Sequence, residues 1–490
     1  MRLKIKELNY RTEGPLICVL NKKDALNLDI HASDRVVIKG NKKEAIAVAD
    51  INEGDIIKEG HIGIFYEVGK YLGLEKGHVE VQLAKKLESL WFIRNKLEGK
   101  KLSKEEINEI VKDIVENRLN EGEMTYFVAG CFSHGMNMEE TYNLTKAIVE
   151  NGSKLELRKK IILDKHCSGG IPGNRTTMII VPIIAAAGFC IPKTSSRAIT
   201  SAAGTADTME VLANVSFPIK KIKKIVKKTN CCIIWGGGVD LAAADDRLIK
   251  VRRPLSLDPE GLLLASIMAK KNAVGATHVL IDLPIGTGSK FETPGKIKTL
   301  KEKFIKLGKM LGMKVLVILT DGRQPIGNGI GPSLEAIDAL NILQNKGPND
   351  LKEKSIYMAG LLLKMAGVKN GMKKARDILE SGLAYEKMKE IIKAQEGNIF
   401  RAEQVIIGKF HKDVISSKSG IVKEINNKKI SKIARIAGAP IDKGAGLYLY
   451  VHLKNNVKKG DKLFTVYSNS RKRLDYACKL VEDDGPAITI

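Results

Sequence analysis

Three short polar segments within residues 164–210 combine glycine, hydroxyl and cationic residues in patterns suited to binding an anion. The first, DKHCSGG at 164–170, follows an apolar run at 160–163 and precedes an apolar stretch from Thr176, which predicts a strand-to-helix turn. Such a turn exposes backbone N–H groups at a helix N-terminus, where the helix dipole favours negative charge. The second, KTSSR at 193–197, adds hydroxyls and a guanidinium, and the third, SAAGTAD at 201–207, opens another helix. The expected ligand is phosphate or a phosphorylated molecule.

Four apolar runs in the middle of the chain alternate with helical segments, which predicts an α/β sheet flanked by helices. The runs lie at 160–163, 231–235, 277–282 and 314–319. Binding sites in such sheets lie beyond the carboxyl ends of the strands. Polar loops with glycine follow the four runs, at 169–170, 236–238, 286–288 and 321–322. We therefore expect the loops to reach one cleft at a single edge of the sheet.

The rest of the chain predicts two further kinds of domain. Residues 1–84 contain short apolar runs separated by Gly, Asn and Asp, which predicts a small β-rich domain, with the spacing of a barrel. Residues 85–408 are expected to hold an all-α lobe, in which Ser103 and Glu106 form a capping box, and the α/β core. Residues 409–490 predict a β-rich α+β C-terminal domain. The predicted fold class is multidomain α/β, as a chain of 490 residues would suggest.

The composition raises nucleic-acid binding as an alternative. The chain carries 81 Lys and Arg against 56 Asp and Glu, a formal net charge of +25. Aromatic residues, which stack on exposed bases, make up only 5% of the chain. The lysines of residues 220–228 alternate with isoleucine and valine at helical spacing, which indicates an amphipathic helix with a solvated face. Nucleic acid is therefore the less favoured partner, and a small anionic substrate is preferred.

The sequence lacks two kinds of pattern: apolar segments typical of membrane or secreted proteins, and cysteine spacings typical of zinc sites or disulfides. No apolar run reaches membrane-spanning length and the first residues lack an apolar signal core, so we expect a cytoplasmic protein with no membrane partner. Seven cysteines are scattered without CxxC spacing, which predicts neither a zinc site nor a disulfide framework.

Several motifs resemble those of a known enzyme family. SSRAITSAAGTADTMEVL at 195–212 is similar to the signature of the thymidine and pyrimidine-nucleoside phosphorylases, and DKHCSGG resembles their Lys-His-Ser-Thr-Gly-Gly loop. GGIPGNRTTM at 169–178 and RPLSLDPEGLLLASIMAKK at 253–271 resemble the archaeal AMP phosphorylase branch of that family. The resemblance covers residues 85–490 at the level of the family and the whole chain at the level of the branch.

This resemblance implies phosphorolysis of AMP, with CMP and UMP as further candidates, in nucleotide salvage or degradation. Inorganic phosphate would displace the base and form ribose 1,5-bisphosphate, without a metal or an organic cofactor. The resemblance also implies a homodimer or larger homo-oligomer, an all-α lobe that receives a segment from after residue 205, and lobes that close over the substrate. The alternatives are a pyrimidine-nucleoside phosphorylase and a phosphoribosyltransferase of related architecture, which would need a diphosphate leaving group.

The same resemblance assigns roles to individual residues. Lys165, Ser196 and Thr205 match positions that contact inorganic phosphate. The positions that match nucleotide contacts are Gly170, Ser196, Arg197, Ala198, Ile199, Thr200, Ser201, Thr205, Ser266 and Lys290. Arg197 and Lys290 carry the cations that could meet the 5′-phosphate of the nucleotide.

Asp258 has two alternative roles. It precedes Pro259 and an apolar helical stretch, which suits a helix N-cap with proline at the first helical position. The resemblance instead assigns Asp258 as the proton donor to the leaving base, a task for which a buried carboxyl is expected.

The sequence departs from the pyrimidine enzymes at two positions. Cys167 replaces a serine of their phosphate loop, and Val251 stands where their pyrimidine-reading arginine would align. Arg252 or Arg253 could take that role only through a local shift, so the base preference stays open. His166 suits either a base catalyst or a residue that orients the loop.

Overall fold

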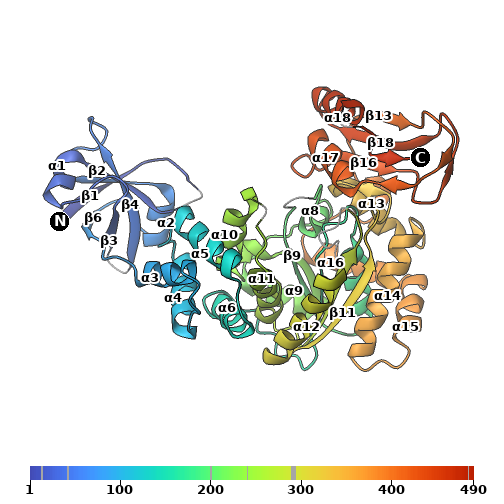
Figure 1. Ribbon diagram of the computed structural model, residues 1–490, viewed down its shortest axis with the longest axis horizontal. Coiled ribbons are helices and arrows are strands. Elements are labelled where there is room, and N and C mark those ends of the chain that lie inside the picture. Colours follow the sequence, from blue (N-terminus) through green and yellow to red (C-terminus); the bar gives the residue numbers. More distant parts are fainter. Residues whose placement is uncertain are drawn as a thin grey trace. The chain divides into compact units, whose positions relative to one another are not determined.

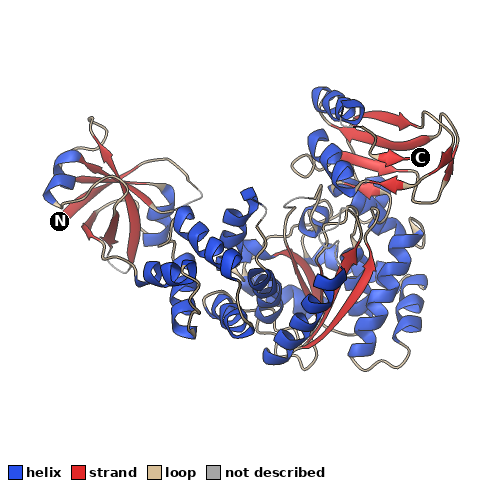
Figure 2. Ribbon diagram, viewed as in Figure 1, coloured by secondary structure: helices blue, strands red, loops and turns tan. Residues whose placement is uncertain are grey.

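The computed structural model describes residues 1–12, 15–40, 43–198, 201–239, 241–255, 257–287, 294–483 and 485–490. Helices and strands are mixed along the chain, and strands dominate both terminal regions (Figure 1, Figure 2). The predicted class, multidomain α/β, is confirmed. The chain divides into two compact units: residues Met1–Gly152 with Ala243–Ser266, and residues Ser153–Ala242 with Ile267–Ile490.

A closed six-stranded barrel forms the start of the first unit. Its strands are β1 (Arg2–Glu7), β2 (Ile17–Asn21), β3 (Arg35–Lys39), β4 (Glu44–Asn52), β5 (His61–Ile64) and β6 (His78–Leu83). They are hydrogen-bonded in the order β1-β5-β2-β4-β3-β6, and α1 (Lys22–Asn27) and α2 (Tyr66–Leu72) lie in the connections. Alternate side chains of β3, such as Val36 and Ile38, are fully buried because successive residues of a strand face opposite sides. The predicted barrel is confirmed.

The helical part of the first unit contains α3 (Glu88–Leu97), α4 (Lys104–Val115), α5 (Glu121–His134), α6 (Met138–Glu150) and α10 (Ala243–Arg252). The predicted capping box of Ser103 and Glu106 is present at the start of α4. Lys96 and Glu140, both buried, form an ion pair of 2.8 Å inside the lobe. Helix α10 packs against α4 and α5, so the lobe does take in a segment from after residue 205.

The second unit is built on parallel strands. Strands β11 (Lys314–Asp321), β10 (His278–Ile285) and β7 (Leu163–Cys167) form one parallel group, and β8 (Ile191–Ser195) and β9 (Cys231–Trp235) form another. A parallel bridge between Ile162 and Cys190 connects the groups. The predicted α/β arrangement is confirmed, and β9 has the predicted bounds. The run predicted at 160–163 is displaced: the strand begins at Leu163 and includes Asp164 and Lys165, because tertiary partners allow these polar side chains to be buried.

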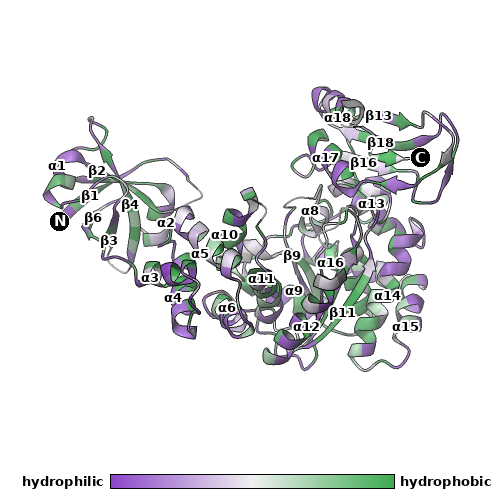
Figure 3. Cartoon of the chain, in the orientation of Figure 1, coloured by the Kyte–Doolittle hydropathy of each residue, from purple (hydrophilic) through white to green (hydrophobic). Residues whose placement is uncertain are grey.

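Helices pack around these strands. They are α7 (Thr176–Ala186), α8 (Thr205–Met209), α9 (Ile219–Thr229), α12 (Pro294–Met310), α13 (Pro332–Leu343), α14 (Asn349–Met365), α15 (Gly371–Glu380) and α16 (Leu383–Ala394), while α11 (Glu260–Ala273) runs across the boundary of the two units. Figure 3 shows β11 as largely hydrophobic. Helix α7 is buried from Thr176 to Ala185 and packs on α14 and α16, and Thr176 at its start accepts a hydrogen bond from Lys165 of β7.

The C-terminal part of the second unit is a four-stranded antiparallel sheet with the order β12-β16-β18-β13. Its strands are β12 (Gly329–Ile330), β16 (Gly446–Leu449), β18 (Lys462–Ser468) and β13 (Phe410–Ile415), and α17 (Asn427–Ala437) and α18 (Arg471–Asp483) pack on it. Two short pairs, β14 (Gly420–Ile421) with β17 (Asn456–Val457) and β15 (Glu424–Ile425) with β19 (Ile488–Thr489), complete it. Among the described helices, none has the length and apolar character needed to cross a membrane.

Candidate active site

The polar loops of the second unit emerge at one edge of its parallel strands. Cys167, the last residue of β7, pairs with Asp282 of β10, and Asp282 pairs with Ile318 of β11. Ser195 and Trp235, which end β8 and β9, also pair with each other. Because all of these strands are parallel, the segments that follow them leave on the same side. For the described residues the loops leave the strands on one side, as predicted; that they reach one cleft stays a prediction.

Lys165 lies on β7, two residues before the end of the strand. Its side chain is buried, and its Nζ donates to Thr176 Oγ1 at 2.7 Å, which joins the first polar loop to the N-terminus of α7. Burial lowers the pKa of the Lys165 ammonium to about 8, although Cys167 and Asp282 oppose this effect. An ammonium and a hydroxyl at a helix N-terminus are groups suited to holding a phosphate oxygen.

A second set of buried charges lies behind Lys165. The Asp164 carboxylate is 2.7 Å from Lys271 Nζ and 3.5 Å from Lys193 Nζ. Burial lowers the pKa of Lys271 to about 7, while Asp164 opposes the shift. Burial, followed by the field of Lys271 and the other nearby lysines, holds the pKa of His166 well below its ordinary value. His166 is therefore a neutral imidazole at neutral pH, which is compatible with either role considered for it.

The Cys167 thiol is not prepared for nucleophilic attack. Burial, and then the Asp282 carboxylate, raises the pKa of Cys167 to about 12, so the thiolate is scarce. Asn174 Nδ2 lies 3.0 Å from the sulfur. On its other side Asp282 accepts from Thr320 Oγ1 at 2.6 Å and forms an ion pair of 2.9 Å with Lys354. The thiol thus fills a place in a fixed polar network.

The segment that begins at Ser196 is wrapped around Asp207. The carboxylate of Asp207 accepts from the backbone N–H groups of Ala198 and Gly204 at 2.7 and 2.8 Å. A Cβ at Gly204 would lie 2.5 Å from the Ser196 carbonyl oxygen, so this close approach requires glycine. Ser196 is exposed, and Ser201 Oγ donates to the Ala203 carbonyl at 2.8 Å.

Arg197 already has anionic partners. Its guanidinium donates to Glu210 at 2.6 and 2.8 Å and to Asp207 at 3.2 Å, and it lies 4.8 Å from the centre of the Trp235 ring. The bonds from Arg197 lower the pKa of Glu210 to about 2. Arg197 therefore stabilises this loop, and its predicted contact with the nucleotide stays a prediction.

The other residues of this unit that were predicted to contact the nucleotide differ in exposure, and some are not described. Gly170 is exposed with a positive φ of 65°, and Thr205 is buried at the start of α8. Ile199, Thr200 and Lys290 lie outside the described residues.

The residues predicted for the base side lie in the first unit. Ser266 is buried, and its Oγ donates to Asp245 Oδ2 at 2.8 Å. Arg252 connects this pair to the predicted proton donor, because its Nη2 is 3.8 Å from Asp245 and its Nη1 is 3.7 Å from Asp258. The structure thus brings Asp258 and Ser266 into one network.

The surroundings of Asp258 differ from those expected in one respect. Helix α11 begins at Glu260, and a backbone bond runs from the Leu263 N–H to the Pro259 carbonyl at 2.9 Å. Asp258 lies two residues before this start, and its N-cap role stays a prediction. The Asp258 side chain is 43% exposed, whereas a buried carboxyl was expected.

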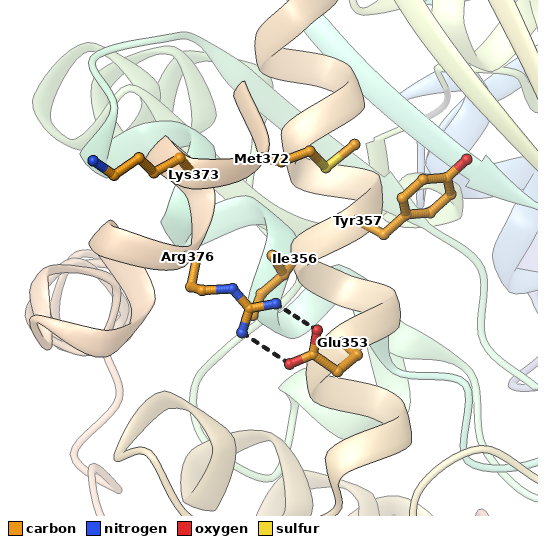
Figure 4. A pocket seen from close by; sticks show the side chains of 6 residues that line it. All are labelled: Glu353, Ile356, Tyr357, Met372, Lys373 and Arg376. Atoms are coloured by element: carbon orange, nitrogen blue, oxygen red, sulfur yellow. Dashed lines mark hydrogen bonds and ion pairs between the residues drawn. The ribbon is translucent and has the colours of Figure 1, made fainter. Parts of the chain in front are cut away.

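Two surface pockets lie along α14. The pocket in Figure 4 is lined by Glu353, Ile356, Tyr357, Met372, Lys373 and Arg376, and the Arg376 guanidinium spans the Glu353 carboxylate at 2.6 and 2.9 Å. It contains no predicted site residue. The neighbouring pocket, of about 470 Å³, includes Thr320, Asp321 and Lys354 and so reaches the carboxyl end of β11. Among the described residues, no three His, Cys, Asp or Glu side chains gather in a way that could hold a metal ion.

Known proteins are similar to this chain over nearly its whole length. The AMP phosphorylase of Thermofilum pendens is 44% identical over 490 residues, which cover 100% of this chain and 95% of the relative. That of Pyrococcus furiosus is 47% identical over 486 residues, with 98% and 96% covered. The chain belongs to the AMP phosphorylase family.

Models of the domains typical of this family match three parts of the chain. A glycosyl transferase family helical bundle domain matches residues 92–152, the corresponding a/b domain matches 159–385, and a pyrimidine nucleoside phosphorylase C-terminal domain matches 421–485. Among solved structures, anthranilate phosphoribosyltransferase from Thermus thermophilus aligns with a TM-score of 0.53 at 18% identity, over 62% of this chain and 99% of that chain. The last similarity shows a shared fold.

Sequence reasoning did not find several buried partners of the predicted site. Arg175, Asp282, Glu335 and Lys354 all contribute charges beside the predicted residues. Asp282 alone had a recognisable signal, because it is a single carboxylate inside the apolar run HVLIDLPI. Glu335 and Lys354 lie on helices far away in the sequence, and nothing local distinguishes them from solvated charges.

Proposed function

We propose that this protein catalyses the phosphorolysis of AMP. An oxygen of inorganic phosphate forms the bond to C1′ of the ribose 5-phosphate, the C1′–N9 bond breaks, and adenine leaves with a proton on its nitrogen. The products are adenine and ribose 1,5-bisphosphate. CMP and UMP are further candidates, and the reaction needs no metal or organic cofactor because cationic side chains can hold the phosphate.

The observation that carries this proposal is the bond between buried Lys165 and Thr176 at the N-terminus of α7, with Arg175 linking that N-terminus to buried Thr205, in a chain whose relatives are named AMP phosphorylases. Lys165, Ser196 and Thr205 would hold inorganic phosphate. The loop from Ser196 to Ser201, with Gly170, Ser266 and Lys290, would contact the nucleotide.

Asp258 is the proposed proton donor to the leaving base. Its exposure leaves the carboxyl group accessible to a base, and in its protonated form that group can give its proton to the leaving nitrogen and become a carboxylate 3.7 Å from the Arg252 guanidinium. Apo structures commonly show catalytic groups at longer distances than the reacting complex does, so the 3.7 Å separation is compatible with this role.

We further propose a cytoplasmic homo-oligomer, at least a dimer. The helical part of the first unit exposes Trp91, Tyr126 and Phe132, each with more than half of its surface accessible, on α3 and α5. Large exposed aromatic side chains of this kind favour association through the lobe. Light scattering that found only a 53.8 kDa species would contradict this proposal.

The division into domains at 1–84, 85–408 and 409–490 also remains a proposal, because the compact units follow different bounds.

Steady-state assays with AMP, adenosine, uridine and thymidine, each with inorganic phosphate, test the function. We expect AMP to have the highest kcat/KM, because the 5′-phosphate supplies a second anion for a strongly basic chain. A higher value for any unphosphorylated nucleoside would favour the pyrimidine-nucleoside phosphorylase alternative. Synthesis of a nucleotide from a base and a ribose diphosphate donor, without phosphorolysis, would favour the phosphoribosyltransferase.

A further inference from the structure

Arg175 occupies a central position between two of the anion-binding segments. It is the N-cap residue of α7, directly before Thr176, and only 8% of its surface is exposed. Its Nη2 donates to the Ala203 carbonyl at 2.6 Å, and its Nη1 donates to Thr205 Oγ1 at 3.4 Å and to the Asn174 carbonyl at 3.3 Å. One guanidinium therefore joins the loop that carries Thr176 to the loop that carries Thr205.

The remaining edge of the guanidinium faces a buried carboxylate. Arg175 Nε donates to Glu335 Oε2, and Glu335, on α13, is 1% exposed. The same oxygen accepts from Thr208 Oγ1 at 2.9 Å, one turn after Thr205 on α8. The Glu335 carboxylate thus holds both Arg175 and the helix that Thr205 begins.

These contacts use most of the hydrogen-bonding capacity of Arg175. A guanidinium has five N–H donors in a rigid planar fork, and the hydrogen bonds of Arg175 engage its three nitrogen atoms. A side chain engaged in this way acts on a ligand through the groups that it holds. Burying the charged Arg175 side chain costs desolvation free energy, which is offset only when the partners of the ion pair are well placed.

We propose that Arg175, held by Glu335, is a positioning residue that sets the separation of Thr176 and Thr205 for inorganic phosphate. This inference rests on the proposed function, because it treats Lys165, Thr176 and Thr205 as one anion site. Lys165 orients Thr176 from one side and Arg175 orients Thr205 from the other. The ion pair of Arg175 and Glu335 serves the attacking phosphate, since among the described residues it contacts neither Asp258 nor Ser266.

Steady-state kinetics of Arg175→Lys in the full-length protein test the inference. A lysine keeps the charge, but its single nitrogen does not reproduce the planar fork whose three nitrogens reach Glu335, Ala203 and Thr205 in the native protein. We expect KM for phosphate to rise roughly 10- to 100-fold, as for a displacement of about 1 Å in a binding group, while KM for AMP changes less than about threefold. Calorimetric titration with inorganic phosphate alone should show the same loss of affinity.

Arg376→Lys is the matched control. Arg376 pairs with Glu353 on α14 in the same unit, through two bonds of 2.6 and 2.9 Å (Figure 4). Its hydrogen bonds among the described residues go to Glu353 and Glu380, outside the anion-binding loops. We expect it to leave both KM values unchanged. An Arg175→Lys variant with wild-type melting temperature and a KM for phosphate within twofold of wild type would overturn the inference. Equal increases in both KM values would also overturn it, since they indicate a general structural role.

Thr208→Val supplies the answer if Arg175→Lys does not fold. It removes one hydroxyl that approaches Glu335 without disturbing a charge, and we expect KM for phosphate to rise roughly two- to fivefold with KM for AMP unchanged. If the two KM values of Thr208→Val change together, or neither changes, the inference is wrong. If the wild-type protein bound phosphate but did not cleave AMP, the proposed function would fail, while the titrations would still decide the role of Arg175.

Discussion

Two candidate regions differ in how completely their polar groups are paired. The proposed phosphate side lies in the second unit and comprises Lys165, Thr176, Thr205, Arg175 and Glu335; the proposed base side lies in the first unit and comprises Asp258, Ser266, Arg252 and Asp245. Lys165, Arg175 and Glu335 are each at most 8% exposed, and hydrogen bonds connect them to hydroxyls and carbonyls of two loops. On the base side, Arg252 is also buried, but its Nε and Nη1 have no hydrogen-bond partner among the described residues. Its separations from Asp245 and Asp258 are 3.8 and 3.7 Å, longer than hydrogen bonds.

This difference suggests two ways of building a site. A rigid set of donors costs little reorganisation when an anion arrives, so it suits the attacking phosphate, which is the same in every turnover. Each buried donor of an arginine that lacks a hydrogen-bond partner destabilises the protein by roughly 1–3 kcal/mol. A movement of neighbouring groups that supplies the partner would remove this destabilisation. We therefore expect the phosphate side to be sensitive to geometry and the base side to adjust to the base that it binds.

The largest effect should follow from changing the base side. Asp258→Asn removes the transferable proton, and we expect turnover to fall by roughly 10²–10⁴-fold, the usual contribution of a positioned acid. Binding of AMP should change little, because the amide retains the shape of the side chain. Turnover, AMP binding and melting temperature measured on the same preparation decide the matter.

Because asparagine caps a helix about as well as aspartate does, the variant should keep its stability whether or not Asp258 caps α11. A folded Asp258→Asn variant with nearly wild-type turnover would remove Asp258 from the mechanism. It would also remove the main reason to regard this network as the base side.

The next effect concerns the charge of Lys165. Burial lowers its pKa to about 8, so the ammonium is present below that pH and is lost above it. We expect KM for phosphate to be nearly constant at lower pH and to rise by up to about tenfold per pH unit above 8, because binding favours the charged lysine. Measuring KM for phosphate against pH gives the slope.

Lys165→Arg is the control for this pH dependence. Arginine remains protonated throughout the range, so the rise in KM should disappear even if the absolute affinity is lower. A wild-type profile that stays flat above pH 8, or an unchanged slope in the arginine variant, would show that another group controls the affinity for phosphate.

A smaller effect should follow from Arg252→Gln. Contacting residues typically couple by about 0.5–3 kcal/mol, and at 3.7 Å from Asp258 we expect a decrease in turnover of roughly tenfold. A double-mutant cycle with Asp258→Asn tests the connection. If Arg252 acts through Asp258, its substitution should have almost no effect in the Asp258→Asn background, whereas additive losses would separate the two residues.

The same contrast explains how far the sequence could predict the molecule. Strand β9 was predicted with its observed bounds because CCIIW is apolar throughout and follows Asn230, which takes a left-handed conformation after α9. Strand β7 was displaced because Asp164 and Lys165 are polar, and their burial depends on Lys271 and Thr176. Local patterns carry information on apolar strands and glycine turns, but a buried charge is acceptable only through partners that sequence spacing does not identify.

The candidate site shows the same limit. Lys165 and Thr205 were predicted through their motifs; Lys165 lies on β7, two residues before its end, Thr205 begins α8, and both are buried. Arg175 lay within GGIPGNRTTM but had no assigned role, because its partner Glu335 is 160 residues later. The surroundings of Asp258 could not be predicted either, since they depend on how Arg252 and Asp245 face the loop before α11.

We expect the smallest effect from Cys167→Ser. This substitution tests whether phosphate binding depends on the positions of the loops or on the chemical identity of each donor. Cys167→Ser restores a hydroxyl at the position where the pyrimidine enzymes have serine. Burial and the Asp282 carboxylate raise the pKa of Cys167 to about 12, so the native thiol remains protonated and contributes little charge to phosphate binding. We expect KM for phosphate and turnover to change less than about threefold, with a stability change near the ~1 kcal/mol typical of a point substitution.

A serine hydroxyl can replace the thiol between Asn174 and Asp282, so the two loops should keep their positions. Kinetics and a melting curve of Cys167→Ser, compared with those of Arg175→Lys, provide the measurement. A loss of turnover above about 100-fold in a folded Cys167→Ser variant would mean that the sulfur itself takes part in the reaction. In that case the phosphate side would depend on a particular atom, and the distinction drawn between a rigid phosphate side and an adjustable base side would fail.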